Sequence, residues 1–202
     1  RRIGQPAYAR DGLEHACSVQ PEEPRLRAAL IELYEEIGAY RELAYVLRQD
    51  AEVEPDAERR FELYRRAGEL LVSVGEAEAA LEPLAQAAAL RPEDHDQVIA
   101  LADAYMGSGR LQEAVELLQE AIGGFKKRRS PQLAAMQLRM ARIAGISGDH
   151  ETQKEWLSVA LDSDKNNGEI ASELAELAMA LQDDETALKA LARYMERARP
   201  AL

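Results

Sequence analysis

The sequence predicts an all-α protein in which short helices follow one another in antiparallel pairs, and three observations support this class. Alanine and leucine recur throughout, whereas only 5% of the residues are aromatic, and this mix favours helix-on-helix packing over a β-sandwich. Prolines and glycines lie between the periodic apolar segments rather than inside them. An apolar helix end followed by a glycine turn recurs along the chain, which indicates internal repetition.

Residues 1–21 are expected to form the second half of a repeat. Gly4 stands where a turn is needed, and Pro6 is tolerated in a first helical turn. An apolar stripe then leads to Pro21, through Ala9, Leu13 and Ala16. Such a half repeat at one end, and no polar capping helix around Arg199–Leu202 at the other, suggest a piece of a longer array. We expect both ends to expose apolar surface, which would permit a homodimer.

Five units of two helices each are predicted next, at residues 24–57, 61–94, 95–128, 134–167 and 168–201. The clearest unit, 61–94, has one helix carrying Tyr64 and Leu71 and a second carrying Leu84, with Pro92 closing the unit. The turns between the two helices of each unit are marked by Gly38, Gly75, Gly109 and Gly148, with Gln182 in the same place. Their spacings are 37, 34, 39 and 34 residues.

The residue types at the positions that recur in each unit have structural reasons. Glycine in the turn permits the positive φ that ends a helix at low cost. A small residue on the first helix allows the partner helix to cross closely, as at Gly68, Ala102 and Ala141. An alanine opening the second helix keeps the two axes close, as at Ala80, Ala114 and Ala187.

Two insertions lengthen the spacing. Three extra residues near Ala57–Arg60 and five near Arg129–Leu133 are expected to lengthen the helices beside them. Leu43, Asp50 and Gln153 stand where small residues are expected, and Lys126 and Lys165 replace closing prolines.

A period near 34 residues carrying two helices resembles the tetratricopeptide repeat, here as five repeats and a leading half repeat. The resemblance implies a right-handed α-α superhelix over residues 1–202, a solenoid whose first helices line a concave surface that binds proteins or peptides.

The family's groove positions map onto seven candidate residues of the first helices: Glu32, Glu35, Glu69, Asp103, Arg139, Arg142 and Glu176. Glu69 has Arg65 four residues before it, but Glu32, Asp103 and Glu176 have no cation three or four residues away. The acids are either a solvated face or a mildly acidic groove for a basic partner. Arg139 and Arg142 could take a carboxylate, although pairing with acids of a neighbouring helix is the simpler interpretation.

No residue pattern predicts a catalytic, metal or cofactor site. His15 and Cys17 lie two residues apart on a helix and so face different sides, and His95 and His150 stand beside capping acids at helix starts. A net charge of −12 disfavours nucleic acid, because its binding needs cations that displace counterions. No apolar run approaches the ~20 residues that span a bilayer. One cysteine and no export signal suggest the cytoplasm.

The sequence therefore favours a non-enzymatic scaffold for protein–protein interaction. The alternative is a structural module that stacks or dimerises through its repeat ends. Helical-repeat RNA binding of the pentatricopeptide kind is disfavoured by the acidic charge and by that family's longer period.

Overall fold

The structure, a computed structural model, describes residues 6–20, 23–126 and 129–198. All regular secondary structure in these residues is α-helical, in eleven helices. The predicted all-α class is confirmed. Contacts divide the chain into two compact units, Arg1–Arg91 and Pro92–Leu202. The division into repeats, and their union in a single solenoid, stays a prediction, and Gly4, Pro21 and Arg199–Leu202 lie outside the described residues.

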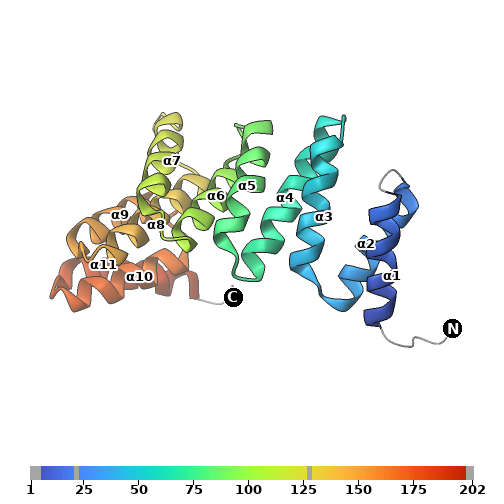
Figure 1. The fold of residues 1–202 in the computed structure, drawn as a ribbon. Helices are drawn as coiled ribbons and strands as arrows, with labels where there is room; N and C mark the ends of the chain where they lie inside the picture. Colours follow the sequence, from blue (N-terminus) through green and yellow to red (C-terminus); the bar gives the residue numbers. More distant parts are fainter. Residues whose placement is uncertain (1–5, 21–22, 127–128, 199–202) are drawn as a thin grey trace. The chain divides into compact units, whose positions relative to one another are not determined.

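Unit 1 holds a leading helix and two helix pairs (Figure 1). Its helices are α1 (Pro6–Val19), α2 (Pro24–Ile37), α3 (Tyr40–Val53), α4 (Ala57–Ser73) and α5 (Ala77–Leu90). Neighbouring helices in the chain are also neighbours in space, α1 against α2 and α3 against α4. The hydroxyl of Tyr34 on α2 donates to Glu14 on α1 at 2.8 Å, and this contact ties the leading helix to the first pair.

Unit 2 holds three helix pairs. Its helices are α6 (His95–Gly107), α7 (Leu111–Gly124), α8 (Pro131–Ile146), α9 (His150–Ser163), α10 (Gly168–Ala180) and α11 (Asp184–Ala198). The first helices of the pairs are α6, α8 and α10, as α2 and α4 are in unit 1. The first helix α8 also lies against the preceding first helix of unit 2, α6.

The turns inside the five pairs share one geometry. Gly38, Gly75, Gly109 and Gly148 have φ between +70° and +81°, and Gln182 in the same place has φ +60°. The residue after each turn donates its backbone N–H to a carbonyl five residues earlier, for example Glu76 to Leu71 at 2.9 Å. This 6→1 bond is the Schellman motif, which satisfies a carbonyl left open at the helix end.

Each unit has a core of its own. In unit 1, Phe61 and Tyr64 of α4 pack with Ala51 and Ala87. In unit 2, one buried cluster joins α6, α7 and α8, and another joins α8, α9 and α10 with Ala190 of α11. The small residues Ala80, Ala102, Ala114, Ala141 and Ala187 are all buried.

The structure corrects the expectation that prolines and glycines lie only between helices, and it shows how the insertions affect helix length. Prolines and glycines do occur inside helices, because Pro83 lies within α5 and is fully buried, and Gly68 lies within α4. The insertions do lengthen helices: α4 has 17 residues and α8 has 16. The carboxylate of Asp56 caps α4 by accepting from the Arg59 backbone N–H at 2.9 Å, which fixes the start of the longer helix.

Candidate functional site

The predicted groove residues all lie on first helices. In unit 1, Glu32 and Glu35 are on α2 and Glu69 is on α4. In unit 2, Asp103 is on α6, Arg139 and Arg142 are on α8, and Glu176 is on α10. Among the residues that the structure describes, five of the seven side chains form ion pairs, within a first helix or between two of them, whereas Glu32 and Glu176 do not. We call the surface that the candidate residues form within each unit the first-helix face.

In unit 1 the first-helix face joins α2 to α4. Arg66 of α4 forms an ion pair with Glu35 of α2. Arg65 binds two acids of its own helix, Glu62 and Glu69, each at 2.6 Å. These bonds, with that to Glu62 contributing most, raise the pKa of Arg65. Glu69 is therefore neutralised by the neighbour that the sequence indicated.

In unit 2 the same arrangement joins α8 to the first helices on either side. Arg139 donates from Nε and Nη2 to the two carboxylate oxygens of Asp103 on α6, at 2.9 and 2.8 Å. Arg142 pairs with Glu169 of α10 at 2.6 Å and also with Glu173. Both arginines pair with acids of neighbouring helices, as the simpler interpretation held.

Asp103 has no cation on its own helix, but it is paired with a cation of the next first helix. Its partner lies 36 residues further along the chain, and a spacing of three or four residues reveals only partners on the same helix. A bidentate guanidinium–carboxylate pair fixes both side chains in one geometry. Asp103 and Arg139 thus hold two repeats together rather than presenting free charges.

Two of the candidate acids have no cation bound to them within the described residues. Glu32 on α2 is exposed and forms no ion pair within the described part of the chain. Glu176 on α10 accepts a hydrogen bond from the Ser172 hydroxyl at 3.2 Å, a neutral donor that leaves its charge in place. Both occupy the ninth position of their predicted repeats, so the charges that remain available recur at one place in the repeat.

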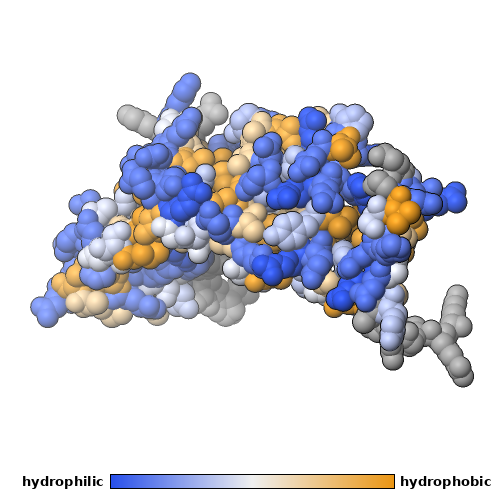
Figure 2. Space-filling view, viewed as in Figure 1, coloured by the Kyte–Doolittle hydropathy of each residue, from blue (hydrophilic) through white to orange (hydrophobic). Residues whose placement is uncertain are grey.

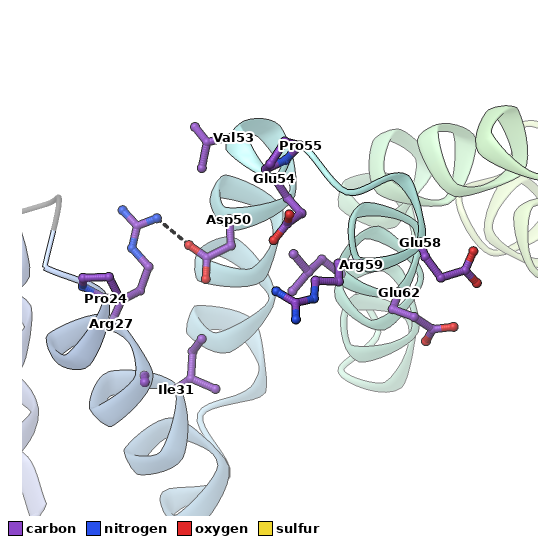
Figure 3. A pocket seen from close by; sticks show the side chains of 12 residues that line it. Pro24, Arg27, Ile31, Asp50, Val53, Glu54, Pro55, Glu58, Arg59 and Glu62 are labelled. Atoms are coloured by element: carbon purple, nitrogen blue, oxygen red, sulfur yellow. Dashed lines mark hydrogen bonds and ion pairs between the residues drawn. The ribbon is translucent and has the colours of Figure 1, made fainter.

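A pocket in unit 1 was not predicted. It has a volume of about 670 Å³ and lies between α2, the end of α3 and the first turns of α4 (Figure 3). Its apolar lining comes from Ala28, Ile31, Val53, Pro55 and Leu63, together with Pro24. The signal that could have indicated it is the insertion near Ala57–Arg60, because the added turn of α4 forms one wall.

The charged residues of this pocket are mostly paired. Arg27 and Asp50 form a half-buried ion pair at 2.5 Å. Glu58 pairs with Arg91, which also lies over the Phe61 ring at 3.7 Å, and Glu62 pairs with Arg65. Arg59 makes no side-chain ion pair with any described residue.

The histidines and the cysteine are in ordinary surroundings. His95 stacks on Phe125 with ring centroids 4.5 Å apart, and a ring nitrogen of His150 lies 3.2 Å from the Gln153 amide oxygen. Cys17 is half-buried and unpaired. Within residues 6–20, 23–126 and 129–198, no three His, Cys, Asp or Glu side chains are grouped as a metal ion would require.

None of the helices described is both long and apolar enough to span a bilayer. Polar side chains cover most of the face shown in Figure 2, with smaller apolar areas between them.

A profile of the tetratricopeptide repeat family matches residues 1–127. The chain belongs to this family. Tetratricopeptide repeats generally act as scaffolds for protein interaction rather than as catalysts. No curated protein gives a significant match to the tetratricopeptide chain.

Solved structures with the same fold include BtubC (BKLC) from P. vanneervenii, which has a TM-score of 0.65 at 16% identity. That alignment covers 98% of this chain and 93% of BtubC. MamA from Desulfovibrio magneticus RS-1 has a TM-score of 0.62 at 17% identity, covering 88% and 96%. PilF of Pseudomonas aeruginosa has a TM-score of 0.62 at 17% identity, covering 87% and 78%. These likenesses establish the repeat fold.

Proposed function

We propose that each unit of this tetratricopeptide chain contacts a protein or peptide partner on its own first-helix face, and that a basic residue of the partner binds Glu32 in unit 1 or Glu176 in unit 2. The observation that carries this proposal is the contrast in pairing. Glu35, Glu69 and Asp103 are neutralised within the chain, whereas Glu32 and Glu176 keep their charges available on the same set of helices.

The ion pairs between first helices support the proposal by preorganising the surface. Binding costs free energy when rotamer-rich side chains become ordered, about 0.5–1.5 kcal/mol for each one. The side chains of Arg66, Arg139 and Arg142 already contact acids of the adjacent repeat. A partner that settles among them therefore orders fewer side chains, and the remaining acids attract its cations.

The test uses a short fluorescent peptide of alternating lysine and serine as the probe. The double variant Glu32→Lys/Glu176→Lys should bind it at least about tenfold more weakly than the unaltered chain, because two attractive contacts of about 0.7 kcal/mol each are lost. Fluorescence anisotropy at low and physiological salt measures the Kd, and the difference should shrink as salt screens exposed charges.

A matched control separates a local site from the overall acidity of the chain. Glu120 on α7 and Glu155 on α9 are exposed acids of second helices, so Glu120→Lys/Glu155→Lys makes the same change in net charge. The control should retain most of the binding. Equal weakening in both double variants would show that the peptide responds only to net charge, and would end the proposal.

Self-assembly is the second candidate function, and one observation favours it. Leu188 and Met195 lie seven residues apart on α11, on one side of the helix, and are 68% and 65% exposed. An apolar stripe of this kind is what a further repeat or a second copy would cover. Mass measurements over a range of concentrations should then show a dimer that Leu188→Glu/Met195→Glu converts to a monomer. A monomer at every concentration would exclude this role.

A further inference from the structure

We infer that the pocket of unit 1 holds an apolar side chain from an extended segment of a partner, with an adjacent carboxylate of that segment bound to Arg59. The inference rests on the proposed function and assigns part of the same partner to a second place in unit 1. The segment would therefore have mixed charge, with basic residues for Glu32 and an acidic residue next to the apolar one.

The apolar side chains of the pocket explain why it would hold an apolar side chain of the partner. Val53 at the end of α3 is 75% exposed, and it lines the pocket with Ile31, Pro55 and Leu63. Burying such side chains against a ligand is worth roughly 25 cal/mol per Å² of apolar area. Pockets that bind ligands commonly measure about 300–1,000 Å³, and this pocket of about 670 Å³ therefore fits a short peptide segment.

The charged residues that line the pocket explain why a carboxylate of the partner would bind Arg59. Asp50 is neutralised by Arg27, Glu58 by Arg91 and Glu62 by Arg65. One oxygen of Glu54 accepts the Asp56 backbone N–H at 3.0 Å in the turn before α4. Arg59 is the lining cation whose guanidinium has no acid bound to it within the described residues. In Figure 3 its side chain extends from α4 toward α3, whereas the carboxylates of Glu58 and Glu62 lie on the other side of α4.

The N-terminus of α4 does not itself provide the anion site. Asp56 caps the helix through the Arg59 backbone N–H, so an incoming carboxylate would meet the capping carboxylate there. The guanidinium of Arg59 is free of this repulsion and can bind a carboxylate through two parallel hydrogen bonds. Glu58 and Arg59 of the inserted turn both line the pocket, so this turn supplies part of a pocket wall and also the cation to which no described acid is bound.

The experiment titrates the ¹⁵N-labelled chain with capped peptides of sequence Gly-Ser-Phe-Asp-Asp-Ser-Gly, with lysine in place of both aspartates, and with alanine in place of phenylalanine. The aspartate peptide should shift the amide signals of Ile31, Val53 and Arg59. It should bind about tenfold more tightly than the lysine peptide, since a charge-assisted pair replaces a repulsion. The alanine peptide should leave these signals unchanged.

Matched variants locate the contacts. Arg59→Glu should weaken the aspartate peptide about tenfold and reverse the preference for aspartate over lysine. Arg25→Glu is the control, because Arg25 is also an exposed arginine in the first turn of a first helix and does not line the pocket. Val53→Asp should abolish binding, whereas Val72→Asp, at an exposed valine of α4 outside the pocket, should not. Unchanged circular dichroism establishes that each variant is folded.

Three results would overturn the inference. They are an absence of shifts at the pocket with any peptide at millimolar concentration, equal or tighter binding of the lysine peptide, and equal losses from Arg25→Glu and Arg59→Glu. The two proposals fail separately. The basic peptide and the Glu32 and Glu176 variants test the first-helix face, and none of those residues lines the pocket.

Discussion

At the scale of single residues, the turns show how one backbone requirement is met with two residue types. Four of the five pairs place glycine in the left-handed region, and the last places Gln182 there at φ +60°. A side chain in this region costs about 1–2 kcal/mol, because its Cβ approaches the carbonyl oxygen. A Cβ at Gly75 or Gly109 would meet no heavy atom within 4 Å, so the backbone alone sets the cost.

The turn positions should therefore respond in opposite directions. We expect Gly109→Ala to lower the free energy of unfolding by about 1 kcal/mol, and Gln182→Gly to raise it by up to about 1 kcal/mol. Urea denaturation followed by circular dichroism measures both. Gly123→Ala, in the ordinary helical backbone of α7 with open space around it, is the control and should be neutral or stabilising. A destabilising Gln182→Gly would contradict this account.

Gly68 carries a different requirement, which is space. A Cβ there would lie 2.5 Å from Cγ and Cδ2 of Leu84, a buried side chain of α5. We expect Gly68→Ala to cost about 1–3 kcal/mol through overpacking. In a Leu84→Ala background the same change should cost far less, because the clashing atoms are gone. A double-mutant cycle by denaturation measures this, and additive effects would show that the two residues do not meet as described.

At the scale of elements, the sequence predicted each helix pair but not each contact between its helices. Gln153 on α9 stands where a small residue was expected. The structure provides the missing space on the facing helix, because Gly145 of α8 has no side chain and a Cβ there would lie 2.8 Å from the Gln153 amide. Periodicity within one helix cannot reveal such an exchange between two helices. For the same reason the sequence indicated that Arg139 pairs with an acid of a neighbouring helix but did not identify Asp103 as that acid.

Helix caps should make the stability of unit 2 depend on acid pH. Asp149 and Asp183 cap α9 and α11, and backbone N–H donors from Thr152 and Thr186 hold their pKa values below the ordinary range, with Lys154 also lowering that of Asp183. Because the folded state favours the carboxylates, their contribution is present above a pH of about 4. It is lost as the pH falls through the lowered pKa values.

Replacing either cap by asparagine keeps a capping side chain and removes the titrating group. We expect Asp149→Asn and Asp183→Asn to lose less stability between about pH 6 and pH 3 than the unaltered chain does, as measured by urea midpoints. Asp162→Asn, at an exposed aspartate of α9 that caps no helix, is the control. An equal pH dependence in all four proteins would rule out the caps as its source.

At the scale of the whole molecule, each unit has its own buried cores. Phe61 and Tyr64 lie at the centre of one core in unit 1, and the clusters of α6–α8 and α8–α11 lie in unit 2. Stability in repeat proteins is the sum of local terms, since each repeat contacts its neighbours. The division of the chain into two compact units between Arg91 and Pro92 therefore predicts two parts that fold largely by themselves.

We expect residues 1–91 and residues 92–202, produced separately, each to be helical and to unfold cooperatively. Circular dichroism at increasing temperature measures this, and hydrogen exchange shows whether the helices that are protected in the full chain keep their protection. A matched cut within unit 2, such as residues 1–129 with 130–202, divides the α6–α8 cluster and should leave α6 and α7 poorly protected, whereas α8 keeps its packing against α9. Unfolded products from the first cut would refute the division.

The sequence by itself determined the helix pairs, their turns and the family, because these follow from local rules: apolar periodicity, positive φ after a helix, and a repeat near 34 residues. The tertiary structure alone decided which charges remain available and where a pocket opens. Those features depend on side chains from helices that are distant in sequence, such as Asp103 with Arg139, and on how far the inserted turn of α4 extends beside α2 and α3.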